Sequence, residues 1–142
     1  MDSRTIKQLA IGDAAEFSKT VTETDIAMFA AISGDFNPVH VDAKYAAGTP
    51  FGARVAHGPL TLALCAGILG TRLPGLGTVA VSNRIEYRRP VYIGDTITAR
   101  VEVAELDVER NRATMVIRWT NQDDTVVAEG EAVVKPPVTP AL

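Results

Sequence analysis

Residues 60–73 read LTLALCAGILGTRL, and Arg72 is the only charged residue among them. Pro59 stands directly before this stretch, and proline is favoured in the first turn of a helix. We therefore expect a long helix over about residues 59–73 that is apolar nearly all round. Such a helix must be covered on most of its sides, so the elements that cover it decide the fold.

Four strand-like segments follow this helix, at about residues 78–87, 94–107, 111–121 and 125–135. Clusters of Gly, Asn and Asp separate them. Apolar and polar residues alternate along the segments, and one face of the second carries Ile97, Ala99, Val101 and Val103. This alternation predicts long antiparallel strands with one solvated face. The sequence therefore predicts an α+β fold, in which a curved antiparallel sheet wraps around one central apolar helix.

Signals for shorter elements precede the apolar helix. A strand-like pattern covers residues 14–21, and Thr22 then has the features of a helix cap, with an acidic side chain three residues later. We expect this helix to continue to about Ser33 and to end at Gly34, because glycine tolerates the left-handed conformation. Asp42 is expected to cap a short helix that ends near Gly48.

Size and charge limit the classes of protein to consider. With 142 residues, 46% of them hydrophobic and 22% charged, the chain is long enough for one sizeable core. We expect a single domain over residues 1–142 with a frayed C-terminal tail from about residue 136. The formal net charge of -3 offers no electrostatic basis for binding nucleic acid.

Cysteine usage and hydropathy indicate the compartment. Cys65 is the only cysteine, which excludes an intramolecular disulfide and fits a reducing environment. The longest apolar stretch is too short to span a membrane, and the N-terminus lacks the apolar core of a signal peptide. We therefore expect a cytoplasmic protein with no membrane partner.

Residues 31–40, which read AISGDFNPVH, place the carboxylate of Asp35 and the imidazole of His40 five positions apart. Asn37 and Pro38 between them force the chain to bend. A bend of this kind can bring both side chains to one water molecule. The same composition is also typical of a helix stop followed by a loop in which Asp and Asn bind their own backbone. The motif alone leaves both interpretations open.

Three stretches carry a family likeness: residues 33–40 read SGDFNPVH, residues 56–59 read AHGP, and residues 87–95 read YRRPVYIGD. In order and spacing they resemble the MaoC-like, R-specific enoyl-CoA hydratases of the hotdog fold, over about residues 8–135. The resemblance implies that Asp35 and His40 form the catalytic pair and that the backbone amide of Gly58 binds the thioester carbonyl.

The resemblance also implies a substrate and an assembly. The substrate would be a trans-2-enoyl-CoA, hydrated to the R-3-hydroxyacyl-CoA by a homodimer whose two sheets join edge to edge. Coenzyme A would be part of the substrate, and neither a separate cofactor nor a metal is expected. One departure concerns a serine that several hydratases of this family carry about one turn into the central helix. Cys65 and Ala66 stand there without a hydroxyl, which bears on substrate preference and rate.

Hydration of an enoyl thioester needs three groups, and this chain offers a candidate for each. The imidazole of His40 can accept a proton from water at neutral pH. The carboxyl group of Asp35 can orient that water, and it can pass a proton to C2 if burial favours its protonated form. The N–H of Gly58 lies at an expected helix start with no side chain in the way, so it can stabilise the enolate oxygen. We assign His40 as base and Asp35 as proton donor, although groups this close share their titration.

Other residues admit two interpretations. Arg84, Arg88 and Arg89 suit the phosphates of coenzyme A, but they equally suit a solvated strand face. Phe51 is expected to line the substrate site. His57 is expected to be a structural residue that fixes the loop before the helix, because no second His or Cys stands at metal spacing. Cys65 is expected to be a small core residue.

Three other functions compete with a hydratase. A thioesterase can share the fold, but residues 59–73 contain no acid that would activate water at the carbonyl. A 3-hydroxyacyl-[acyl carrier protein] dehydratase would use the same pair in reverse, so the sequence leaves it open. An acyl-thioester-binding protein without catalysis would have no need for an acid and a base beside a polarising amide.

Overall fold

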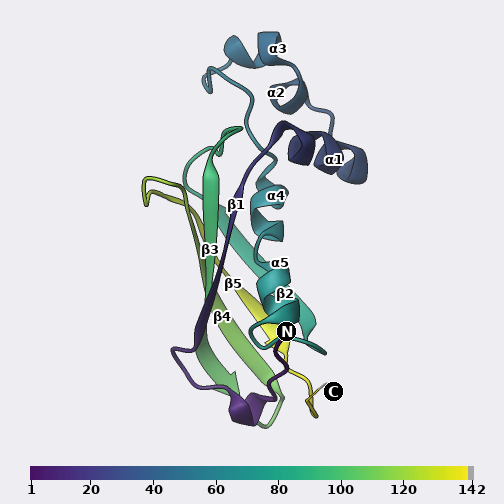
Figure 1. Cartoon of the computed structure of the whole chain (residues 1–142), viewed down its shortest axis with the longest axis vertical. Coiled ribbons are helices and arrows are strands. Elements are labelled where there is room, and N and C mark those ends of the chain that lie inside the picture. Colours follow the sequence, from purple (N-terminus) through teal and green to yellow (C-terminus); the bar gives the residue numbers. More distant parts are fainter. Residues whose placement is uncertain (141–142) are drawn as a thin grey trace.

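The computed structural model describes residues 1–140 and contains a five-stranded antiparallel sheet with the strand order β1-β3-β4-β5-β2. Its strands are β1 (Ala14–Thr20), β2 (Val79–Tyr87), β3 (Thr96–Asp107), β4 (Arg112–Thr120) and β5 (Val126–Lys135). The strands are long, and the helices lie to one side of the sheet (Figure 1). The predicted strands are therefore confirmed to within about two residues at each end.

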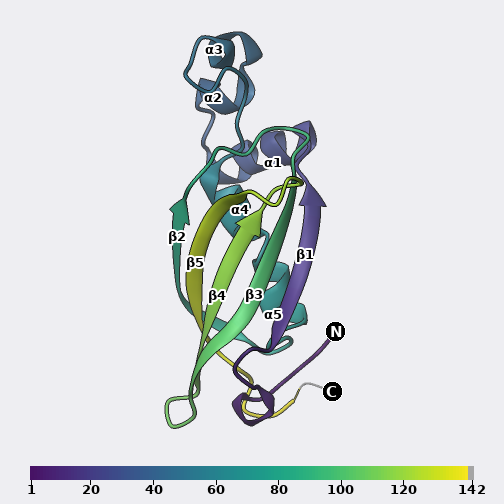
Figure 2. The ribbon, with the colours of Figure 1, turned by 90° about the vertical axis from the view of Figure 1, so that its left-hand side faces the viewer.

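Most of the helices form two groups: a column along the face of the sheet, made of α4 (Gly58–Ala63) and α5 (Ala66–Thr71), and a projection past one end of it. The remaining helices are η1 (Ile6–Gln8), α1 (Glu23–Ser33), α2 (Pro38–Val41) and α3 (Ala43–Ala47). Helices α4 and α5 follow one another along the face of the sheet, whereas α1, α2 and α3 project past one end of it (Figures 1 and 2). The expected α+β arrangement of a sheet around a central apolar helix is confirmed. None of the helices within residues 1–140 is long and apolar enough to cross a membrane.

The core lies between the sheet and the α4–α5 column. Alternate residues of β3 (Ile97, Ala99, Val101 and Val103) are all 0% exposed, as the pattern predicts. They belong to one cluster with Leu60, Leu64 and Ile68 of the column and its turn. Burial of each leucine or isoleucine contributes roughly 2 kcal/mol, so this contact fixes the column on the sheet.

The central helix differs from the expected uninterrupted helix over 59–73, because a tight turn at Leu64 and Cys65 separates α4 from α5. The N–H of Leu64 donates to the carbonyl of Thr61 and that of Cys65 to the carbonyl of Leu62, each at 3.2 Å. These bonds span three residues, as in a 3-10 turn, rather than the four of an α-helix. The Cys65 thiol also donates to the Leu62 carbonyl, at 3.1 Å. An apolar pattern does not distinguish the two hydrogen-bonding schemes.

Strand β2 is an edge of the sheet and is unusually exposed. It pairs with β5 on one side, and all of its residues except Ile85 are exposed. Its large apolar side chains Val79, Val81 and Tyr87 are 59%, 43% and 51% exposed. An apolar edge strand offers unpaired backbone groups to a further strand.

Helix α1 begins and ends at the predicted residues. Thr22 Oγ1 accepts the N–H of Asp25 at 3.2 Å, and Asp25 Oδ2 accepts the N–H of Thr22 at 2.8 Å. Lys19 Nζ lies 2.9 Å from the same carboxylate oxygen. At the other end, Gly34 adopts φ 76° in the left-handed region and its N–H donates to the carbonyl of Ala30. These caps fix where the chain leaves α1.

Two local features differ from the expectations drawn from the sequence. Helix α2 was expected to be only a bend, but Asn37 Oδ1 accepts the N–H of Val39 at 3.2 Å and starts one helical turn at Pro38. Four residues are too few to show a helical period.

The C-terminal tail was expected to fray from residue 136, yet Pro136 and Pro137 are buried and Asn111 donates to the Pro136 carbonyl at 2.8 Å. Residues 138–140 are exposed, and 141–142 lie outside the described residues.

The beginning of the chain and the end of β5 meet the same loop. The N–H of Leu76 donates to the carbonyl of Asp2 at 2.7 Å, and Pro137 packs against Gly77. This loop precedes β2, so it lies at the end of the sheet away from α1, α2 and α3 (Figure 1).

The carboxylate of Asp25 should contribute stability that depends on pH. Burial opposes its ionisation, but hydrogen bonds from Thr22 and Lys19 outweigh burial and lower the pKa of Asp25. A lowered pKa gives stability that is present above the ordinary aspartate value and is lost as the pH falls through the folded value. Asp25→Ala should therefore reduce the free energy of unfolding by about 1 kcal/mol at neutral pH, and by less below about pH 4. Urea unfolding at both pH values measures this.

Asp123→Ala, in the turn between β4 and β5, is the matched control and should leave the free energy of unfolding unchanged at both pH values. An equal loss for Asp25→Ala at both pH values would contradict the role of its charge.

Candidate active site

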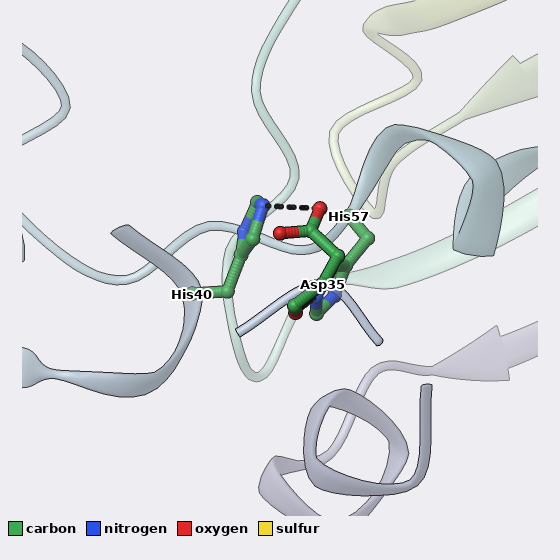
Figure 3. A group of neighbouring side chains, drawn as sticks. All are labelled: Asp35, His40 and His57. Carbon is green, nitrogen blue, oxygen red and sulfur yellow. Dashed lines mark hydrogen bonds and ion pairs between the residues drawn. The ribbon is translucent and has the colours of Figure 1, made fainter. Parts of the chain in front are cut away.

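The structure brings Asp35 and His40 together beside the start of α4. Asp35 lies in the loop between α1 and α2, and His40 lies on α2. His40 Nε2 and Asp35 Oδ2 are 3.7 Å apart (Figure 3). This separation exceeds a direct hydrogen bond, but one water molecule can contact both atoms.

The tautomer of His40 follows from its partner. His40 Nδ1 lies 2.7 Å from the carbonyl oxygen of Val55. A carbonyl only accepts, so Nδ1 carries the hydrogen in the neutral ring and Nε2 carries the lone pair. That lone pair faces Asp35, which suits His40 for the role of base.

Asp35 uses its two carboxylate oxygens differently. Oδ1 accepts the N–H of Asn37 at 3.1 Å, whereas Oδ2 faces His40. The side chain of Asp35 is 50% exposed and that of His40 only 12%, so the carboxylate is the more accessible partner. Oδ1 therefore stabilises the local turn, as the loop interpretation predicts, while Oδ2 lies near His40, as a shared water molecule would require.

His57 is buried behind the pair. It is 1% exposed, and its Nε2 lies 2.9 Å from the carbonyl oxygen of Asp35. Its ring stacks on that of His40 with 3.8 Å between centroids and 29° between planes, and Phe29 lies 5.0 Å away. Sequence analysis expected a structural role in the loop before the helix and missed the contact with Asp35. The position of His57 directly before Gly58 was the only feature of the sequence that indicated a place near the site.

One ligand atom from each of Asp35, His40 and His57 lies within 4.8 Å of the others. The two imidazole rings lie face to face, with 3.8 Å between their centroids, and the Nδ1 hydrogen of His40 is taken by the carbonyl of Val55. The Nε2 hydrogen of His57 is also taken by the carbonyl of Asp35. The arrangement suits proton transfer better than metal chelation.

Gly58 is the first residue of α4, where the helix supplies no acceptor for its N–H. A Cβ on Gly58 would lie 2.7 Å from Cζ and 2.9 Å from Oη of Tyr87. Only glycine therefore fits beneath this ring without a shift. Sequence analysis missed this contact, because Tyr87 lies 29 positions further along the chain. Partial burial raises the pKa of Tyr87, so its hydroxyl stays protonated at neutral pH.

The arginines lie apart from the pair. Arg84 is within 3.0 Å of Glu86 and 3.6 Å of Glu131, and Arg88 is within 2.7 Å of Glu86 and 3.4 Å of Glu129. These side chains line a groove of about 550 Å³ with exposed charged residues of β3 and β4. Their placement favours the solvated strand face over contact with coenzyme A. Arg89 is exposed as well.

Phe51 lies in the loop after α3 and is 44% exposed. Its carbonyl accepts a hydrogen bond from Tyr92 Oη at 3.0 Å, which ties this loop to the segment before β3.

An apolar groove of about 330 Å³ runs between the α4–α5 column and β2. Its lining includes Leu62, Cys65, Ala66, Leu69, Gly70 and Ala80. Burial raises the pKa of the Cys65 thiol to about 11, so this thiol is protonated at neutral pH and takes no part as a nucleophile.

Comparison with known proteins identifies the family. Residues 7–126 match the model of the MaoC like domain. The chain belongs to the MaoC-like domain family. Its expected membership, drawn from three short motifs, is confirmed.

Three relatives of this MaoC-like protein match over most of their own length. A 3-hydroxybutyryl-CoA dehydratase of Methylorubrum extorquens is 45% identical over 92% of this chain and 83% of the relative. An (R)-specific enoyl-CoA hydratase of Aeromonas caviae is 40% identical over 92% of this chain and 98% of the relative. The solved structure of an R-hydratase from Pseudomonas aeruginosa has a TM-score of 0.89 and 41% identity, and covers 95% of this chain and 86% of that one. The expected hotdog fold is confirmed.

The two imidazoles of this MaoC-like protein should occupy opposite neutral tautomers. Both of their carbonyl partners can only accept, so His40 should carry its hydrogen on Nδ1 and His57 on Nε2. Nitrogen-15 NMR of the ring nitrogens at a pH where both rings are neutral should show one ring of each kind. His40→Gln and His57→Phe assign the two signals, because the chain has only 2 histidines. Two rings of the same tautomer would contradict the geometry.

Proposed function

We propose that this protein is an R-specific enoyl-CoA hydratase, which adds water reversibly to a trans-2-enoyl-CoA to give the R-3-hydroxyacyl-CoA. The observation that carries the proposal is the approach of His40 Nε2 to 3.7 Å from Asp35 Oδ2, beside the free amide that begins α4. The names of the three relatives described above, two hydratases and one dehydratase, support the same reaction class.

The reaction follows from the lone pair on His40. A water molecule between the two side chains gives a proton to His40 Nε2 while its oxygen bonds to C3 of the enoyl group. The π electrons of the C2–C3 double bond then move to the thioester oxygen, which the Gly58 N–H stabilises by on the order of 3 kcal/mol. The carboxyl group of Asp35, acting in its protonated form, passes its proton to C2, and the proton held by His40 then returns to the Asp35 carboxylate. The net result is the addition of one water.

The acyl tail has a place in the apolar groove between the α4–α5 column and β2. Gly58 begins this column, so a thioester carbonyl at its amide directs the tail along the column toward Leu62 and Ala66. Neither Cys65 nor Ala66 adds a hydroxyl there. The Cys65 thiol donates instead to the Leu62 carbonyl, at 3.1 Å, so the central helix offers the tail no hydroxyl here, although Thr78 and Asn83 also line the groove.

Three alternatives fit less well. Neither α4 nor α5 carries a carboxylate, which argues against a thioesterase that activates water from the central helix. A dehydratase acting on acyl carrier protein would use the same atoms. A relative named for acyl carrier protein, from Arabidopsis thaliana, is 32% identical to this chain, whereas the relatives named for coenzyme A described above are 45% and 40% identical. An acyl-thioester-binding protein without catalysis would not need the converging acid and base.

Removal of either member of the pair should abolish most of the activity. A positioned acid or base contributes roughly a hundredfold or more, so Asp35→Asn and His40→Gln should each reduce hydration of crotonyl-CoA by at least that factor. The loss of enoyl absorbance measures the rate, and chiral analysis of the product should give the R alcohol. Asp123→Asn is the control and should match the wild type.

The outcomes separate the alternatives. Activity of either variant within about tenfold of the wild type would remove that residue from the mechanism. Binding of crotonyl-CoA by the wild type without turnover would favour the binding protein. A faster reaction with the carrier-protein thioester than with the coenzyme A thioester would favour the dehydratase.

We also propose that the protein is a homodimer joined through the edge strand β2. The exposed apolar side chains of β2 and the open groove beside it support this assembly, since a second copy would cover both. A two-fold axis would pair β2 with the same strand of the partner and join two sheets edge to edge.

A charge on β2 should therefore separate the subunits. Light scattering should give the mass of two chains of 15.1 kDa for the wild type. Val81→Lys should shift the mass toward a single chain, because a charged side chain on an edge strand opposes pairing with a further strand. Val116→Lys on β4 is a matched control, since Val81 and Val116 are both 43% exposed, and it should remain dimeric. A dimeric Val81→Lys protein would contradict pairing through β2.

A further inference from the structure

The loop that carries Asp35 has one distant anchor. The N–H of Asp35 donates to Ser33 Oγ at 3.2 Å, and its carboxylate accepts the N–H of Asn37. His40, the other partner of the carboxylate, is five positions away. In contrast, the bond from His57 Nε2 to the Asp35 carbonyl spans 22 positions. Within the described part of the chain, this bond ties the exposed loop to the body of the protein.

The ring of His40 is held by the same short segment. Its Nδ1 hydrogen goes to the carbonyl of Val55, and its face lies on the ring of His57 at 3.8 Å. The segment is itself fixed, because the N–H of Ala56 donates to the carbonyl of Val91 at 2.7 Å and the N–H of Val55 to that of Val39 at 3.3 Å. Phe29 supports the His57 ring.

His57 is placed to hold groups and not to exchange protons. It is 1% exposed, and its Nδ1 is buried without a hydrogen-bond partner among residues 1–140. A hydrogen on that nitrogen would be a buried donor with no acceptor, so Nδ1 stays bare. Because Nε2–H is committed to the carbonyl of Asp35, neither ring nitrogen is available to substrate.

We propose that His57 is a positioning residue for the acid/base pair: its Nε2 hydrogen holds the main chain of Asp35, and its ring face holds the plane of His40. The proposal rests on the proposed hydratase function. One buried side chain thereby sets the separation between the two groups that share the reacting water. The reaction tolerates little displacement of these two groups, since a misplacement of about 1 Å can reduce the rate on the order of a hundredfold.

Two substitutions separate the two contacts. His57→Phe keeps a ring between Phe29 and His40 but removes the N–H donor. His57→Gln keeps an N–H donor within reach of the Asp35 carbonyl but removes the ring. Each should lower kcat for crotonyl-CoA hydration by about tenfold or more while KM stays within about twofold, because the substrate contacts are unchanged and only the reacting groups are displaced.

Trp119→Phe is the control for a purely structural effect. Trp119 is 0% exposed and its Nε1 is also buried without a partner among the residues described, but it lies on β4, within the core of the sheet. This variant should lower Tm and leave kcat within about twofold of the wild type, since its cost is one of packing alone. A fall in kcat that matches the loss of folded protein in all three variants would overturn the proposal, as would wild-type kcat in both His57 variants.

A second readout does not depend on activity. In His40→Gln, His57 is the only imidazole left. Nitrogen-15 NMR should then show a hydrogen on its Nε2 that exchanges slowly with solvent, as a buried hydrogen bond requires. A rapidly exchanging hydrogen would overturn the anchor to Asp35. If the wild type fails to hydrate any enoyl thioester, the proposed function fails, and this measurement still decides whether His57 holds the loop.

Discussion

The site depends on one hydrogen bond of the main chain, from the N–H of Ala56 to the carbonyl of Val91, at 2.7 Å. This bond, together with that from the N–H of Val55 to the carbonyl of Val39, fixes the segment that leads into α4 at Gly58. Groups of this segment then orient the side chains of the site. The Val55 carbonyl orients His40, the His57 ring and N–H restrain both members of the pair, and Gly58 presents its amide. An acid, a base and an oxyanion donor therefore share one rigid frame, although their residues come from three different elements.

The sequence predicted the features that local patterns determine. The alternation along β3 and β4 identified the buried faces, because a strand repeats every two residues. Thr22, Asp25 and Gly34 identified the ends of α1, because caps act over three or four residues. Asn37 and Pro38 indicated a bend, and a bend of that size is enough to bring Asp35 and His40 together. These inferences needed no knowledge of how distant segments pack.

The missed features of the site depend on contacts between segments that lie far apart in the sequence. The stack of His57 on His40 and the approach of Tyr87 to Gly58 leave no local signal. The turn at Leu64 and Cys65 was missed because apolar content does not reveal how a helix is hydrogen-bonded. Arg84 and Arg88 admitted two interpretations in the sequence, because a cation suits a phosphate as well as a solvated strand face. Glutamates on β2 and β5 pair with both side chains across the strands, a contact that no local pattern indicates. The charge of a residue indicates which groups it can bind, whereas the pairing of the strands determines which groups lie next to it.

The meeting of Asp2 and Pro137 at the loop before β2 has a practical consequence. Strand β2 runs from this loop to Tyr87, so its full length separates both chain ends from Gly58 (Figure 1). An affinity tag, a fused domain or a chemical linker at either end would therefore lie away from the mouth of the site. The protein can be immobilised or joined to a second enzyme through its ends while the reacting groups keep open access to solvent.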